Sequence, residues 1–213
     1  MVKTAVLVSG DGTNLQAIID ASLNGEIRNC DIAAVISSHP EAYAIERAKN
    51  AGIPAYIVER AVFPNRKVFT KAMLDKLQDI EAAFVVYAGF KYILDPPVVK
   101  AYRHRIINIH PSLVPSFCGP GYYGIRVHEA VLSHGVKITG ATAHFVTDIV
   151  DDGPIILQKS VTVLDDDTPR SLQRRVMEEA EWKILPEAIS LYCEGRLVIE
   201  GRRVRIKTIV ASG

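Results

Sequence analysis

The sequence predicts an α/β protein with a mostly parallel sheet flanked by helices and an antiparallel C-terminal part. Strand-like runs alternate with helical segments from residue 1 to about residue 135, which is the pattern of βαβ units. The strand-like runs are mostly continuous and apolar, as expected of strands covered on both faces of a sheet. Two β-rich runs then follow one another directly, which favours an antiparallel pair.

In the first half, apolar runs and helical periodicity alternate regularly. The predicted strands are residues 4–8, 32–37, 55–58, 84–88 and 106–109, and the predicted helices are residues 14–24, 41–50, 65–78 and 96–103. Gly25 and Gly52 stand where helices commonly end on a left-handed residue. Pro96 and Pro97 suit a first helical turn, where the backbone needs no amide hydrogen.

The second half begins with a glycine-rich loop that holds Tyr122, Tyr123 and Arg126, and we expect this loop to be mobile. The elements predicted after it are a helix at residues 127–133, strands at residues 138–146 and 155–163, a long helix from Thr168 to about Tyr192, and a terminal hairpin of residues 197–200 and 204–209. Thr168 and Pro169 form a suitable N-cap and first turn, and Gly195 ends the long helix.

Composition excludes several classes of function. The 213 residues are 48% hydrophobic, so the chain can bury the core of one domain. With 25 basic and 24 acidic residues the formal charge is +1, which argues against nucleic acid or an anionic membrane as the main partner. We find no signal peptide and no apolar run long enough to span a membrane. Three widely spaced cysteines suit a reducing compartment, so we expect a cytoplasmic protein.

A polar pair ends the strand predicted at residues 106–109. Asn108 and His110 are two residues apart, so their side chains point to the same side of an extended backbone. Pro111 and Pro115 stiffen the segment that follows. A carboxamide and an imidazole that converge on one point can stabilise an oxyanion and transfer its proton. The alternative is that Asn108 caps a turn and His110 is a hydrogen-bonded interior histidine.

The segment SGDGTN, residues 9–14, lies between the first predicted strand and the first predicted helix. Gly10 and Gly12 would let backbone amides approach an anion at the positive end of that helix, which suits a phosphomonoester. A dinucleotide fingerprint needs a third glycine where this chain has leucine, and a Walker A loop needs a Gly-Lys-Ser/Thr ending that is missing. The alternative is a tight turn in which Thr13 or Asn14 caps the helix.

Two acidic residues lie in the turn TDIVDDGP, after a strand that carries His144. If this turn folds beside the strand that ends at His110, Asp151 and Asp152 reach the carboxyl edge of the sheet, where α/β proteins bind ligands. We expect burial to raise the pKa of such a carboxyl towards neutrality and so suit it to proton transfer. The alternative is a plain Asp-Asp-Gly turn.

Other polar residues have structural explanations. No metal-ligand spacing is found among His39, His104, His128 and His134, so we predict no metal site. A solvated hairpin face is the interpretation of Arg202, Arg203, Arg205 and Lys207.

Several segments together resemble one family. They are VLVSGDGTNLQAII, YAGFKYIL, INIHPSLVPSF, HEAVL followed by GVKITGATAHFV, and VDDGPIILQ. In this order they closely resemble the phosphoribosylglycinamide formyltransferases, the folate-dependent transformylases of purine biosynthesis. The resemblance extends to about Gly195 and implies a Rossmann-like formyltransferase fold. We therefore expect a single domain of residues 1–213, with a phosphate- or nucleotide-binding half (1–105), a catalytic and folate-binding half (106–195) and a terminal hairpin (196–213).

The resemblance implies formyl transfer from 10-formyltetrahydrofolate, the co-substrate, to the amine of glycinamide ribonucleotide, N1-(5-phospho-D-ribosyl)glycinamide. It implies small-molecule partners, no metal, and a monomer or homodimer. The implied catalytic set is Asn108, His110 and Asp151. The implied binding residues are Gly12, Thr13 and Asn14 for the substrate phosphate, Arg66, Phe90, Lys91, Tyr92, Ile93 and Leu94 for folate, and Glu181 for the ribonucleotide.

The chain departs from the family pattern in three places. The loop between Phe117 and His128 is longer by several residues. The spacing from Arg175 to Glu181 is one residue longer. Asp152 replaces a small residue beside the implied catalytic aspartate, and its charge is expected to raise the pKa of that aspartate.

Three other functions are weighed against this one. A formyltetrahydrofolate deformylase uses the same chemistry with water as the acceptor, and we expect it to carry an N-terminal regulatory domain for which a strand starting at Thr4 leaves no room. A methionyl-transfer-RNA formyltransferase is expected to carry a C-terminal RNA-binding domain. A noncatalytic folate- or nucleotide-binding module would not need Asn108, His110 and Asp151 together.

Overall fold

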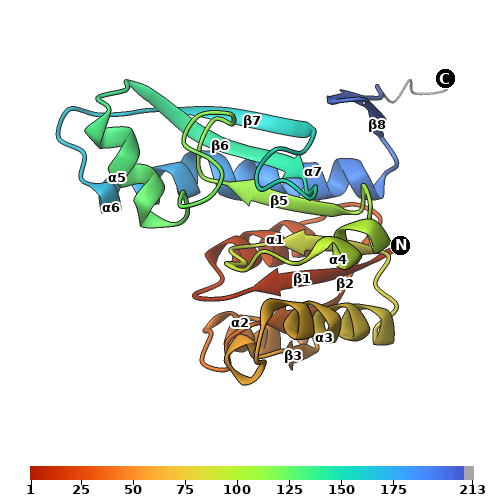
Figure 1. Cartoon of the computed structure of the whole chain (residues 1–213). Helices are drawn as coiled ribbons and strands as arrows, with labels where there is room; N and C mark the ends of the chain where they lie inside the picture. The colour runs from red at the N-terminus through yellow and green to blue at the C-terminus, as the bar shows by residue number, and fades with distance from the viewer. Residues whose placement is uncertain (209–213) are drawn as a thin grey trace.

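The computed structural model describes residues 1–208. Its strands are β1 (Val2–Val8), β2 (Cys30–Ser37), β3 (Ala55–Ile57), β4 (Phe84–Tyr87), β5 (Ile106–His110), β6 (Ile138–Phe145), β7 (Ile155–Thr162), β8 (Leu197–Glu200) and β9 (Arg203–Ile206). They form one sheet in the order β3-β2-β1-β4-β5-β6-β7-β9-β8 (Figure 1). Strands β1 to β5 are parallel, whereas β6 is antiparallel to both β5 and β7. The predicted fold class is confirmed.

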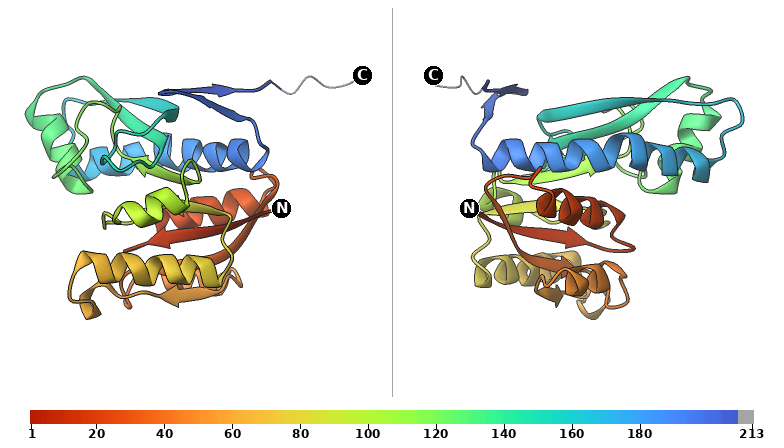
Figure 2. Two further views of the ribbon diagram at one scale, coloured as in Figure 1. Left: turned by 45° about the vertical axis from the view of Figure 1, so that its right-hand side comes forward. Right: turned by 180° about the vertical axis from the view of Figure 1, so that it is seen from behind.

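Helices cover both faces of the sheet. They are α1 (Thr13–Leu23), α2 (Ala44–Asn50), α3 (Arg66–Asp79), α4 (Pro96–Ala101), α5 (Ile125–Ser133), α6 (Pro169–Val176) and α7 (Trp182–Cys193), with a short 3-10 helix at Arg60–Val62 and a π-helix at Met177–Glu181. Helices α3 and α4 lie in front of the sheet in Figure 1, whereas α1 and α7 lie over the opposite face, which Figure 2 shows from behind.

Strand β1 shows why a continuous apolar run is needed. Val6 and Val8 pack in the core layer that contains α1 and α7, whereas Ala5 and Leu7 pack in the layer that contains α3 and α4. All four side chains are fully buried. Because both faces are covered, alternation of apolar and polar residues would leave polar groups in a core, and the sequence avoids it.

The long C-terminal helix begins as predicted but is interrupted by a π-turn. The Thr168 hydroxyl accepts a hydrogen bond from the Ser171 amide, which closes a capping box before α6. The π-helix Met177–Glu181 then separates α6 from α7. A π-turn accommodates one residue more than an α-turn. Gly195 adopts a φ of 67° after α7, as expected of a residue that ends a helix.

Element ends differ where tertiary contacts decide them. Helix α2 begins at Ala44 rather than at residue 41, because the Ala44 amide donates to the carbonyl of Gly10 at 3.2 Å. Strand β9 ends at Ile206, and residue 209, the predicted end of this strand, lies outside the described residues. The hairpin joins the sheet through a parallel bridge between Arg203 and Ile155. Between residues 1 and 208, every helix is too short or too polar to cross a bilayer.

Candidate active site

A cavity of about 520 Å³ lies at the carboxyl ends of β1, β4 and β5. Its lining contains nearly all of the residues that the sequence and the family resemblance selected: Gly12, Thr13, Asn14, Phe90, Lys91, Tyr92, Ile93, Leu94, Asn108, His110, Asp151 and Glu181. Arg66 is not part of this lining. Its guanidinium pairs with the carboxylate of Asp95 at 2.5 Å, and its side chain is 58% exposed.

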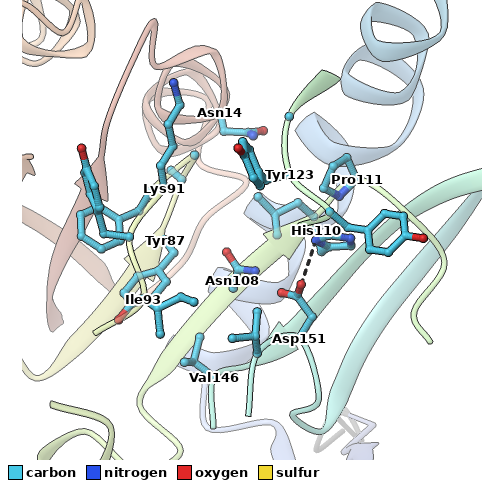
Figure 3. Close-up of a pocket in the computed structure, with 18 of the residues that line it drawn as sticks. Asn14, Tyr87, Lys91, Ile93, Asn108, His110, Pro111, Tyr123, Val146 and Asp151 are labelled. Carbon is cyan, nitrogen blue, oxygen red and sulfur yellow. Dashed lines mark ion pairs between the residues drawn. The ribbon is translucent and has the colours of Figure 1, made fainter. Parts of the chain in front are cut away.

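His110 is the last residue of β5, and its ring is held at both nitrogens. Nε2 lies 2.9 Å from the carbonyl oxygen of Phe117. A carbonyl can only accept, so Nε2 carries the hydrogen and the ring presents Nδ1 to Oδ2 of Asp151, 3.4 Å away (Figure 3). Burial lowers the pKa of His110, although the charge of Asp151 opposes this shift. The ring is therefore neutral at neutral pH and able to take up a proton at Nδ1.

Asn108 lies two residues earlier on β5 and is oriented by a residue of the next strand. The antiparallel register places His144 of β6 directly opposite Asn108. Nδ1 of His144 lies 2.9 Å from the carbonyl oxygen of Phe145 and therefore carries the hydrogen. Its Nε2 accepts a hydrogen bond from Nδ2 of Asn108 at 3.2 Å. One carboxamide hydrogen and the carboxamide oxygen are left for other partners.

The sequence alone assigns no role to His144. The signal that would have identified it is the pairing register of β5 and β6, since opposite residues of an antiparallel pair lie side by side. In the sequence this register was not determined. Nε2 of His144 also lies 3.6 Å from Oδ1 of Asp151. His144 thus contacts both Asn108 and Asp151.

Asp151 comes from the turn between β6 and β7, and its side chain is turned inward. Its φ of 53° is left-handed, a conformation that a non-glycine residue adopts at some cost in energy. The Gly119 amide donates to Oδ2 at 3.0 Å. In Figure 3 the carboxylate points towards His110, with Asn108 beside it. The loop after β5 and the turn after β6 therefore meet at this carboxylate.

The expected rise in the pKa of Asp151 is wrong. Burial does raise the pKa of the carboxyl, but the rings of His144 and His110 and the amide of Gly119 together lower it by more. The net pKa lies below the ordinary value for aspartate. Asp151 is therefore ionised at neutral pH and accepts protons rather than donating them.

The expected influence of Asp152 on Asp151 is also wrong, because Asp152 is paired elsewhere. Arg202 of the terminal hairpin binds its carboxylate in a bidentate arrangement, with distances of 2.8 and 3.0 Å. This pair lowers the pKa of Asp152. Its negative charge is thus compensated by the guanidinium instead of acting on Asp151.

The loop of residues 9–14 begins α1 without a side-chain cap. Gly12 is the N-cap, with a φ of 72°, and neither Thr13 nor Asn14 caps the helix. A Cβ atom at Gly12 would approach the Cβ of Ala44 to 2.6 Å. Glycine is therefore required here both for the left-handed backbone and for close packing against α2. The predicted alternative of a side-chain cap is wrong.

Asn14 makes a long-range contact instead of a cap. Its Nδ2 donates to Oε2 of Glu181 at 2.7 Å, and both side chains are buried in the wall of the cavity. Burial raises the pKa of Glu181 to about 7, against the opposing effect of the hydrogen bond from Asn14. Within residues 1–208, Oδ1 of Asn14 has no hydrogen-bond partner. This pair can present acceptors to a bound polar group.

A π-turn lies between Arg175 and Glu181, where the spacing is one residue longer than in the family pattern. Arg175 is held before the π-helix by a bidentate pair with Asp167 at 2.5 and 2.6 Å. Glu181 is the last residue of the π-helix and lines the cavity. A π-turn is wide enough to accommodate one such additional residue.

An aromatic cluster supports the other wall. The ring of Phe69 lies 6.4 Å from Phe90 and 5.6 Å from Tyr92, measured between centroids, and Phe90 lies 5.2 Å from Tyr87. The Lys91 amide donates to the Ser9 hydroxyl at 3.0 Å, which ties this segment to the end of β1. The wall formed by residues 90–94 is therefore held from both sides.

Comparisons with known proteins show the family to which the chain is similar. The family model described as formyl transferase matches residues 2–189. The chain is 40% identical over 197 residues to the phosphoribosylglycinamide formyltransferase of Haemophilus influenzae, covering 92% of this chain and 90% of that one. The crystal structure of glycinamide ribonucleotide transformylase 1 from Symbiobacterium toebii is 47% identical with a TM-score of 0.91, covering 98% of this chain and 95% of that one.

Other relatives are longer than this chain. It spans 62% of the chloroplastic phosphoribosylglycinamide formyltransferase of Vigna unguiculata and 19% of the trifunctional purine biosynthetic protein adenosine-3 of Bos taurus. A formyltetrahydrofolate deformylase structure from Pseudomonas syringae is 28% identical with a TM-score of 0.86, and the chain covers 67% of it. The family match, the identity and the matched lengths lead to one conclusion: the chain belongs to the formyl transferase family, within the group of phosphoribosylglycinamide formyltransferases.

Proposed function

We propose that the chain transfers the formyl group of 10-formyltetrahydrofolate to the amine of N1-(5-phospho-D-ribosyl)glycinamide, a step of purine biosynthesis. The observation that carries this proposal is the meeting of Asn108, His110 and Asp151 in a cavity that also opens onto the loop of residues 9–14. An oxyanion site, a proton acceptor and a phosphate-binding loop are the three parts that this reaction requires.

The ribonucleotide would lie along the wall formed by α1 and the π-helix. The amides at the start of α1 would bind the phosphate, since the helix begins at Gly12 without a side-chain cap. The unpartnered Oδ1 of Asn14 and the carboxyl of Glu181 would accept hydrogen bonds from the sugar or the glycinamide. This orientation would direct the amine towards Asn108.

The folate would lie against the wall of residues 90–94. Ile93 is 49% exposed and Leu94 is buried behind it, so the wall combines an accessible apolar surface with a fixed support. A flat pterin ring binds such a surface by burial of apolar area. The formyl group at N10 would then face Asn108 and His110.

The chemistry would be a direct attack. The amine nitrogen forms a bond with the formyl carbon, and the carbonyl electron pair moves onto oxygen. A carboxamide hydrogen of Asn108 stabilises the oxyanion, and Nδ1 of His110 contributes while it holds the proton that passes from the attacking nitrogen to the folate. Asp151, acting through a water molecule, removes the proton from the attacking nitrogen, and this proton reaches N10 of the folate as the bond from carbon to N10 breaks. No covalent intermediate with the protein is required.

Two other functions remain to be separated by experiment. The likeness to a formyltetrahydrofolate deformylase structure favours water as a second candidate acceptor. A noncatalytic folate- or nucleotide-binding module would bind the same ligands without turnover. The first predicts conversion that ignores the ribonucleotide, and the second predicts an increase in melting temperature with each ligand but no conversion.

The test is a spectrophotometric assay of 10-formyltetrahydrofolate conversion, with and without glycinamide ribonucleotide. The proposal predicts conversion that depends on the ribonucleotide and yields one formylated amine for each folate released. Equal rates in both reactions would favour the deformylase. Ligand-induced stabilisation in a protein that converts no folate would favour the binding module.

A further inference from the structure

The turn that carries Asp151 is held from two sides. On the inner side, the Gly119 amide binds the Asp151 carboxylate. On the outer side, Arg202 binds the carboxylate of the next residue, Asp152, through two nitrogen atoms. Asp151 itself has a left-handed φ, so its conformation depends on what the surrounding structure imposes. The outer support comes from the terminal hairpin, a segment with no other evident part in the site.

The hairpin is fixed to the sheet close to this turn. Strand β9 forms a parallel bridge with β7 between Arg203 and Ile155, just after the turn. This bridge places Arg202 beside Asp152. The side chains of Arg202 and Asp152 are 72% and 41% exposed. Because exposed ion pairs contribute little to folding stability, we look for the effect of this pair in the neighbouring site.

Several titratable groups surround the His110 ring, and a change in charge at the Arg202–Asp152 pair would add to their effect. Asp151 faces the ring from the turn, His144 from β6, and His128 from α5. Asp152 follows Asp151 directly along the turn. Burial, together with the charges of both aspartates, raises the pKa of the Cys118 thiol in the neighbouring loop. An uncompensated Asp152 would therefore add a second negative charge beside the site.

We propose that Arg202 is a positioning residue that acts through Asp152: it holds the outer side of the turn and offsets the charge of Asp152, so that Asp151 is the carboxylate that acts on His110. The consequence for turnover rests on the proposed function. The effect on the ionisation of the imidazole does not, since it requires no substrate.

The test is an NMR titration of the His110 imidazole at low salt in five proteins without substrate. These are the wild type, Arg202→Gln, Asp152→Asn, the double variant, and Arg205→Gln. Arg205→Gln is the matched control because Arg205 pairs with Glu200 within the same hairpin. We expect Arg202→Gln to raise the titration midpoint of His110 by about half a pH unit, since an added negative charge favours the imidazolium.

The other variants separate charge from structure. Asp152→Asn leaves the charge of Arg202 uncompensated and should lower the midpoint. The double variant, which has neither charge, should match the wild type, and so should Arg205→Gln. Arg202→Lys keeps the charge and should retain the wild-type midpoint. If Arg202→Gln does not fold, the lowered midpoint of Asp152→Asn tests the same charge pair, and an unmoved midpoint there would overturn the proposal. An unmoved midpoint in Arg202→Gln, the same rise in Arg205→Gln, or a rise that persists in the double variant would overturn the proposal.

A parallel pH profile of kcat/KM connects this titration to turnover. If the wild type transfers formyl groups, the acid limb of the kcat/KM profile of Arg202→Gln should shift to higher pH by the same amount as the His110 midpoint. If the wild type transfers none, the proposed function fails, whereas the titration result stands by itself. A midpoint that moves in an active enzyme without any change in the acid limb would show that Arg202 has no influence on catalysis.

Discussion

Oδ2 of Asp151 lies 3.4 Å from Nδ1 of His110, although His110 ends strand β5 and Asp151 belongs to the turn between β6 and β7. The contact depends on the antiparallel strands β6 and β7, which return the chain to the carboxyl end of β5. With Nε2 held by the carbonyl of Phe117, Nδ1 is the ring atom at which a proton can be exchanged with the carboxylate or with a water molecule between them.

Removal of the Asn108 carboxamide should slow turnover without affecting folding. We expect Asn108→Ala to reduce kcat by about two powers of ten, corresponding to roughly 3 kcal/mol for a lost oxyanion donor. The measurement is steady-state kinetics at saturating concentrations of both substrates, with thermal unfolding as the check on folding. A fully active Asn108→Ala enzyme would exclude this residue from the reaction.

Glu181 should make stability depend on pH near neutrality. Its pKa is raised to about 7 in the folded protein, so between pH 4.5 and 7 the folded state binds more protons than the unfolded state. Stability from this group is therefore lost as pH rises through that window. Glu181→Gln should exceed the wild type in free energy of unfolding by up to about 3 kcal/mol at pH 8 and by little at pH 4.

Urea unfolding at several pH values measures this difference. The same variant should raise KM for the ribonucleotide more than KM for the folate. An equal difference in stability at pH 4 and pH 8 would contradict the raised pKa.

Gly12 and Gly10 offer a matched pair of substitutions. Gly12→Ala introduces a Cβ 2.6 Å from the Cβ of Ala44 at a φ of 72°, so we expect a loss of roughly 1–3 kcal/mol in stability and a higher KM for the ribonucleotide. At Gly10 a Cβ meets nothing within 4 Å, so Gly10→Ala should stay close to wild type in stability. Equal effects in the two variants, by unfolding and kinetics, would contradict a special requirement at Gly12.

Asp167 should contribute stability that is lost in acid. Arg175 is the main cause that lowers the pKa of Asp167 to about 2. Because the folded pKa is depressed, this stability is present above the ordinary pKa near 4 and disappears as pH falls towards 2. In Asp167→Asn the acid loss between pH 4 and 2 should shrink, whereas Asp166→Asn, at an exposed neighbour, should retain the wild-type slope. The measurement is acid titration followed by circular dichroism, and a loss in Asp167→Asn as large as in the wild type would contradict this account.

Local patterns were sufficient for the sheet and for part of the site. The apolar runs located the strands because helices cover both faces, and the two-residue spacing placed Asn108 and His110 on the same side of β5. The Asp-Asp-Gly turn was expected at the same edge once an antiparallel return was predicted. These inferences rely on strand periodicity and connectivity, which the sequence contains.

Local sequence patterns did not predict the contacts between distant segments. Asn14 contributes no cap because its carboxamide is bound to Glu181, and Glu181 lies at the end of a π-helix that the sequence did not predict. The pKa of Asp151 stays low because Arg202 pairs with the neighbouring Asp152. The bridge between β7 and β9 brings Arg202 to this position. Each case depends on a register or a turn type that is fixed by tertiary packing.

The most direct test of the central claim is the single-turnover rate of formyl transfer in Asp151→Asn, compared with Asp165→Asn as an exposed control outside the cavity. If Asp151 accepts the proton of the attacking amine, Asp151→Asn should fold normally and transfer at least about 100-fold more slowly, whereas Asp165→Asn should match the wild type. Transfer at the wild-type rate by Asp151→Asn, with both substrates saturating, would contradict the account.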